Sequence, residues 1–104
     1  MTIQFNTDSN ITVSEKFEAS LTTLITSELS RFSDHITRLE VHISDENGRK
    51  EGPNDKRCMI EARLEGLQPI AVTDHGNSAE HAINGAIEKL KSALTSVIGR
   101  LKTH

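Results

Sequence analysis

The stretches RLEVHIS (Arg38–Ser44) and CMIEARLE (Cys58–Glu65) decide the fold, because apolar and polar residues alternate along both. Alternation with a period of two is typical of a strand that has one covered face and one wet face. The apolar face carries Leu39, Val41, Ile43, Cys58, Ile60, Ala62 and Leu64. These stretches therefore predict two strands that pack against a second layer on one side only.

A charged segment, SDENGRKEGPNDKRC (Ser44–Cys58), joins the two stretches. Asn47-Gly48 and Gly52-Pro53-Asn54-Asp55 are turn signals, since Asn and Gly tolerate positive φ and Pro presets a turn. Four acids and four bases interleave between these ends, so the segment is electrically neutral. Such a segment is typical of a solvated, self-compensating hairpin tip, although a contact with a partner stays open.

Two shorter apolar runs flank this hairpin. TIQF (residues 2–5) is a strand candidate at the start of the chain, and IAVT (residues 70–73) follows the turn EGLQP. They bring the number of expected strands to four.

The first helix is expected to start at Thr12, which forms a capping box with Glu15 and has Ile11 outside it as a hydrophobic staple. Apolar residues then recur at spacings of three and four, which marks one face of an amphipathic helix that ends near Ser33-Asp34. They are Phe17, Leu21, Leu24, Ile25, Leu29 and Phe32.

The second helix is expected to start at Asn77 or Ser78, and Glu80 completes a capping box if Asn77 is the cap. Gly85 and Gly99 lie inside it at a cost of about 1 kcal/mol each relative to Ala, and the sequence offers no reason for either. Its apolar stripe consists of Ile83, Ile87, Leu90, Leu94, Val97 and Leu101.

The predicted order is β-α-β-β-β-α, which indicates an α+β fold. A right-handed crossover makes the first two strands parallel if they are neighbours, and hairpins make the others antiparallel. Because each strand has one apolar face, both helices should cover the same side of one four-stranded mixed sheet. Residues 1–104 are expected to form a single domain.

Charge is distributed unevenly along this chain of 104 residues with net charge −3. Residues 86–104 carry +3, which leaves −6 on the remainder. The overall charge argues against indiscriminate nucleic-acid binding but allows a local basic stripe. A single cysteine excludes an intramolecular disulfide, the first residues lack the pattern of a signal peptide, and no apolar run is long enough for a membrane span. We therefore expect a cytoplasmic protein without a membrane partner.

Catalytic, metal and cofactor sites are not expected. Cys58 shares the apolar face of its strand and has no base beside it, so it should be a buried small residue rather than a nucleophile. His75 and His81 are six apart, which is no recognised zinc spacing, and the remaining histidines fall on surface positions. The acids of the wet face fit cross-strand pairing with arginines: Glu40, Glu61 and Glu65 with Arg38, Arg57 and Arg63.

The element order and several local patterns resemble the ribosome hibernation promoting factor / ribosome-associated inhibitor A (sigma-54 modulation protein) family, in its short single-domain form. LSRFSDHI resembles the end of the family's first helix, and SAEHAINGAIEKLKSAL resembles its second helix with an Ala-Ile pair before Lys-Leu. SDENG followed by DKRCMIEARLEGL looks like one bacterial branch of the family. The resemblance covers nearly the whole chain.

This resemblance implies a ribosome-associated hibernation or stress factor. Family members bind the small ribosomal subunit in the decoding region between head and body, and so inhibit translation by occlusion without catalysis. Basic residues on the helical side contact rRNA phosphates, which carries over directly to Arg31 and Lys89. Ribosomal proteins are possible further contacts, and no DNA partner is expected. The resemblance leaves the oligomeric state open.

Further cations of the second helix extend this predicted site. Lys89 and Arg100 are eleven residues apart and share one helix edge, and Lys91 and Lys102 have the same spacing on a neighbouring edge. The expected rRNA-binding residues are thus Arg31, Lys89, Lys91, Arg100 and Lys102, with Lys56 and Arg57 as an accessory contact. A solvated face with cations favoured by the helix dipole is the simpler interpretation.

Two other hypotheses stay open at this point. Ser92 stands where the family usually has Arg, Glu28 where it often has a base, and the usual aromatic residue around Ala79 to His81 is missing. With the negative net charge, these departures favour a diverged member that acts through a protein partner. An enzyme is the third hypothesis, and it lacks a recognisable set of reacting groups.

Overall fold

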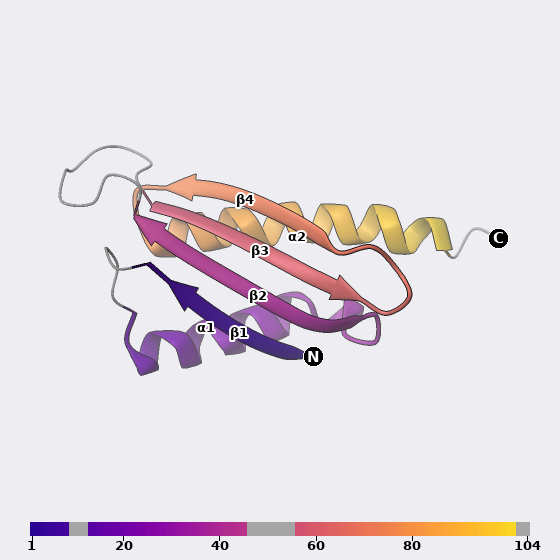
Figure 1. The fold of residues 1–104 in the computed structure, drawn as a ribbon, viewed down its shortest axis with the longest axis horizontal. Helices are drawn as coiled ribbons and strands as arrows, with labels where there is room; N and C mark the ends of the chain where they lie inside the picture. The colour runs from indigo at the N-terminus through magenta and orange to yellow at the C-terminus, as the bar shows by residue number, and fades with distance from the viewer. Residues whose placement is uncertain (9–12, 46–55, 102–104) are drawn as a thin grey trace.

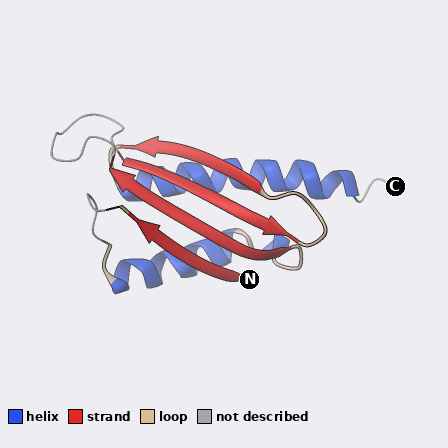
Figure 2. Cartoon of the chain, in the orientation of Figure 1, coloured by secondary structure: helices blue, strands red, loops and turns tan. Residues whose placement is uncertain are grey.

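A computed structural model describes residues 1–8, 13–45 and 56–101. The elements follow the predicted order, with one 3-10 turn (η1) added after the first helix (Figures 1 and 2). None of the helices in these ranges could span a membrane. The elements are β1 (Thr2–Thr7), α1 (Glu15–Glu28), η1 (Ser30–Phe32), β2 (Ile36–Asp45), β3 (Lys56–Leu64), β4 (Ile70–Gly76) and α2 (Ala79–Leu101).

The four strands form one sheet in the order β1-β2-β3-β4. β1 runs parallel to β2, which requires the crossover through α1, and the other neighbours are antiparallel. Both helices lie behind the sheet in the view of Figure 1, with α1 toward β1 and α2 along β3 and β4. The predicted α+β fold, a four-stranded mixed sheet with two helices on one face, is therefore confirmed.

The core lies between the sheet and the two helices. The predicted inward positions of β2 and β3 are all buried, from Leu39 at 0% exposed to Leu64 at 6%. On α2 the stripe is buried as expected as far as Leu94, after which Ile98 is buried and Val97 only partly so. The buried positions of α2 thus continue from Leu94 to Ile98, four residues on, and not to Val97, three residues on.

The start of α1 differs from the expected one, whereas α2 starts at one of its two expected positions. The α1 N-cap is Ser14, whose hydroxyl accepts from the Phe17 peptide N–H at 3.1 Å, so the prediction of Thr12 is wrong. For α2, the Ser78 hydroxyl accepts from the His81 peptide N–H at 3.1 Å, which selects Ser78 over Asn77. In both cases the serine directly precedes the first helical residue, and its hydroxyl accepts from the N–H of the third helical residue.

The strands extend into the charged segment from both sides. β2 continues to Asp45 and β3 begins at Lys56, and these two residues pair across the sheet. The two predicted turns at Asn47-Gly48 and at residues 52–55 lie outside the described residues.

Gly85 allows α2 to approach β4 closely. A Cβ atom at Gly85 would overlap the carboxylate of Asp74, which points from β4 toward the helix. At Gly99, by contrast, a Cβ atom would meet no atom within 4 Å. The helix therefore contains one glycine that its packing requires and one that its packing does not.

Candidate nucleic-acid interface

The predicted cations of α2 lie on two opposite flanks of the helix. The Lys89 ammonium donates to the Thr73 carbonyl at 2.9 Å and pairs with Asp74 at 3.4 Å, both on β4. The Lys91 ammonium lies 3.8 Å from the Glu28 carboxylate of α1 and 3.7 Å from that of Glu88. Two residues correspond to about 200° of rotation around a helix, so the expectation of neighbouring edges is wrong.

Arg31 connects η1 to α2. Its guanidinium donates to the Thr95 hydroxyl at 2.7 Å, and that hydroxyl donates to the Lys91 carbonyl at 2.7 Å. The same guanidinium lies 4.6 Å from the centre of the Phe32 ring. A cation over an aromatic ring is attracted by the ring quadrupole, so Arg31 is held by one contact within η1, to Phe32, and by one contact to α2, to Thr95.

Arg31 and Lys91 therefore lie on the same flank of α2, toward η1 and α1, whereas Lys89 faces β4 at the edge of the sheet. Arg100 is exposed in the last turn of α2, on the flank that helix geometry gives to Lys89. Lys102 lies outside the described residues. The structure thus brings together two of the five predicted residues and separates Lys89 from them.

A pocket of about 220 Å³ lies between η1 and α2, beside Arg31. It is lined by Arg31, Phe32, Thr95, Ile98 and Gly99. Phe32 and Ile98 are buried at 4% exposed and form its apolar part, while Arg31 and Thr95 are exposed and supply its polar part. No sequence pattern points to Thr95 as part of this site, because its contact with Arg31 joins residues 64 positions apart.

The two candidates for an accessory contact point to opposite faces of β3. Lys56 lies on the helix-covered face and pairs at 3.2 Å with Asp45, a carboxylate that is only 7% exposed. Arg57 has the next position on the strand and so faces the open side. The two side chains do not form one patch.

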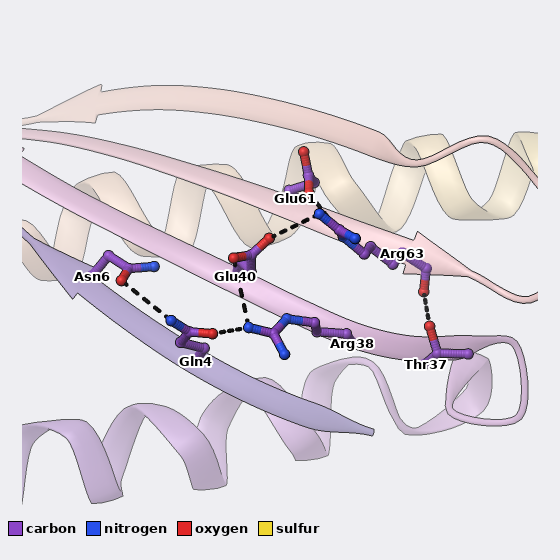
Figure 3. A network of polar contacts seen from close by, with 7 residues as sticks. All are labelled: Gln4, Asn6, Thr37, Arg38, Glu40, Glu61 and Arg63. Atoms are coloured by element: carbon purple, nitrogen blue, oxygen red, sulfur yellow. Dashed lines mark hydrogen bonds and ion pairs between the residues drawn. The ribbon is translucent and has the colours of Figure 1, made fainter.

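The open face of the sheet holds a network of charges (Figure 3). Register places Glu40 opposite Glu61 and Arg38 opposite Arg63. Ion pairs within strands join Arg38 to Glu40 at 3.8 Å and Arg63 to Glu61 at 3.3 Å. A third pair joins Arg63 to Glu40 between strands at 3.6 Å. The prediction of arginine–glutamate pairing holds for these residues, but only one of the three pairs crosses between strands.

Gln4 and Asn6 continue this network onto β1. The Arg38 guanidinium donates to the Gln4 side-chain oxygen, and the Gln4 amide donates to Asn6 at 3.5 Å. Two arginines and two glutamates of this network pair with one another, so their charges compensate. Exposed ion pairs of this kind are worth about 0–1 kcal/mol each. The arginines of the open face thus have carboxylate partners, whereas Arg31 beside the pocket has contacts with the neutral side chains of Thr95 and Phe32.

Cys58 is fully buried at 0% exposed, as predicted. Burial, helped by the negative charge of Asp74 on the neighbouring strand, raises the pKa of its thiol to about 12. The thiolate is the nucleophilic form of cysteine, so Cys58 stays protonated and unreactive at neutral pH. In the described ranges, no three His, Cys, Asp or Glu side chains gather as a metal site.

Comparison with known proteins agrees with this fold. The profile described as "Sigma 54 modulation protein / S30EA ribosomal protein" matches residues 3–102. The chain belongs to the S30EA family. The resemblance inferred from the sequence patterns is thereby confirmed.

Two solved structures have the same fold as this S30EA family member. The N-terminal domain of Thermus thermophilus Protein Y has a TM-score of 0.73 at 18% identity, covering 93% of this chain and 99% of that domain. A ribosomal subunit interface protein from Coxiella burnetii has a TM-score of 0.74 at 16% identity, covering 95% and 99%. At such low identities the similarity establishes the fold alone.

One curated protein, Protein FAM136A from Rattus norvegicus, is 30% identical over 74 residues. The match covers 71% of this chain and 51% of that protein. The S30EA family member thus spans about half the length of the curated relative that it matches.

Proposed function

We propose that this protein is a ribosome-associated hibernation factor that binds the small ribosomal subunit near the decoding region and inhibits translation by occlusion. The observation that carries the proposal is Arg31. It is exposed, held by Thr95 and Phe32, and paired with no carboxylate in the described ranges. A fixed arginine without an acid partner is suited to bind a phosphate group.

The remaining predicted cations complete the proposed rRNA contact. Lys89 is 55% exposed in its side chain and Lys91 31%, so both ammonium groups remain accessible despite their ion pairs. Phosphate contacts position a protein on RNA without reading its sequence, which is sufficient for occlusion. The proposed contact residues are Arg31, Lys89, Lys91, Arg100 and Lys102, with Lys56 and Arg57 as accessory residues.

Occlusion also requires a rigid body. Leu90 and Leu94 fix α2 to the sheet, since both are 0% exposed, and α2 extends for 23 residues. We further propose that residues 1–104 act in the cytoplasm as one domain, without a cofactor, a catalytic step, a membrane or DNA.

A second candidate function rests on the acids of the same surface. Glu28 and Glu88 flank Lys91, Asp74 engages Lys89, and the chain carries a net charge of −3. These features favour a diverged member of the fold that binds rRNA weakly and acts through a protein partner.

Co-sedimentation with purified small ribosomal subunits across a salt series separates the two functions. The wild type is compared with a variant in which Lys89, Lys91, Arg100 and Lys102 are replaced by Gln. Because each neutralised phosphate releases counterions, rRNA binding must weaken steeply with salt. We expect the variant to bind more weakly and with a shallower salt dependence. No co-sedimentation of the wild type at low salt would exclude the hibernation function.

A further inference from the structure

The pocket beside Arg31 combines an apolar floor with a fixed cation. Phe32 and Ile98 are almost fully buried and supply the floor. Gly99 leaves the adjacent space open, because a Cβ atom at this position would meet nothing within 4 Å. A flat apolar group could therefore lie in the pocket without moving a neighbouring side chain.

Arg31 retains most of its hydrogen-bonding capacity. A guanidinium has five N–H donors, and one contact to the Thr95 hydroxyl is its hydrogen bond in the described structure. Stacking on Phe32 uses the face of the guanidinium rather than its donors. The remaining N–H groups are available to an anion at the rim of the pocket.

The size of the pocket limits the ligand. Its volume of about 220 Å³ lies below the roughly 300–1,000 Å³ that is typical of pockets for drug-sized ligands. One planar ring fits such a space better than a complete cofactor. A single nucleotide is a ligand of this kind, because it joins a planar base to an anionic phosphate.

Resting on the proposed function, we infer that this pocket takes one unpaired nucleotide of the bound RNA. The base stacks on the exposed guanidinium of Arg31 and covers Ile98 and the backbone of Gly99, and its phosphate accepts from the remaining N–H groups of Arg31. Unpaired RNA bases are commonly bound by stacking on aromatic rings or guanidinium planes. Phe32 itself is buried, as its apolar spacing predicts. The Arg31 guanidinium over its ring is exposed, so a base can stack on Arg31 instead.

Filling the pocket without changing charge tests this inference. Gly99→Leu places a side chain in the open space, and Ser96→Leu adds the same side chain at an exposed position that does not line the pocket. We expect Gly99→Leu to bind small subunits about tenfold more weakly than Ser96→Leu, from the loss of one stacked base, with the same salt dependence. Equal affinities of the two variants would overturn the inference and leave the proposed function intact.

A second measurement decides the matter if the wild type does not bind subunits, in which case the proposed function fails. The ¹⁵N-labelled protein is titrated with AMP and, separately, with inorganic phosphate, while the amide resonances of Thr95 and Ile98, which line the pocket, are followed. A larger shift with AMP, lost in Gly99→Leu, supports a nucleotide pocket. Equal shifts with AMP and phosphate would overturn it.

Discussion

On each flank of α2 a glycine lies close to a cation, and yet the two flanks differ in what they leave accessible. On the β4 flank, Asp74 occupies the space beside Gly85 and pairs with Lys89. On the η1 flank, the space beside Gly99 is open and Arg31 has only neutral contacts. The neighbouring element, rather than the residue type, therefore determines whether a cation remains accessible to a ligand.

The largest expected effect comes from the two glycines. Gly85→Ala would force a methyl group into the Asp74 carboxylate, and such overpacking typically costs about 1–3 kcal/mol of unfolding free energy. Gly99→Ala meets no neighbour and should stabilise the protein by up to about 1 kcal/mol through helix propensity. Chemical denaturation of both variants measures this difference in sign.

The double variant Gly85→Ala/Asp74→Ala is the control for the first effect. Removing the carboxylate should restore most of the stability that Gly85→Ala loses, because the overlap disappears. Equal stabilities of Gly85→Ala and Gly99→Ala would contradict the distinction between a closed flank and an open one.

The fold could be predicted because its determinants are local. Alternation along residues 38–44 and 58–65 identifies strands and their inward faces, and spacings of three and four identify the helices. The α1 N-cap was harder, since both Thr12 and Ser14 can cap a helix and sequence alone does not choose between them. Ser14 is the one whose hydroxyl meets the Phe17 N–H.

The site could be predicted only in part, because its determinants are distant in sequence. The need for Gly85 comes from Asp74 on another element, and the position of Arg31 comes from Thr95. Helix spacing placed cations on α2 but said nothing of which neighbour each would meet. The resemblance to a family supplied Arg31, whereas the pocket beside it required the packed structure.

The next effect compares the cations of the two flanks. If rRNA phosphates bind mainly at the η1 flank, Arg31→Gln should weaken subunit binding more than Lys89→Gln and reduce the salt slope by about one. Lys89 should contribute less because Asp74 already neutralises part of its charge. Co-sedimentation at several salt concentrations measures both quantities.

Arg63→Gln is the matched control for this pair, since it removes one arginine charge from the open face of the sheet. It should leave binding close to wild type. A larger loss with Lys89→Gln than with Arg31→Gln would move the proposed contact to the β4 flank.

The smallest effect concerns the pH dependence of the β4 flank. The His75 peptide N–H donates to Asp74 at 2.9 Å, and this bond, together with Lys89, lowers the pKa of the Asp74 carboxyl below its ordinary value. A depressed pKa in the folded state stabilises the protein above the unfolded value of about 3.9, and this stabilisation is lost as the pH falls through the folded value.

Asp74→Asn should therefore cost stability at pH 7 and progressively less below about pH 4. The effect should be small, because the Asp74 side chain is 32% exposed and water screens its interactions. Denaturation of the wild type and Asp74→Asn at pH 7, 4 and 3 measures the gap between them. In a Lys89→Gln background the gap should narrow, since Lys89 supplies part of the shift. A gap that stays constant with pH in both backgrounds would contradict the assignment of this effect to the charge of Asp74.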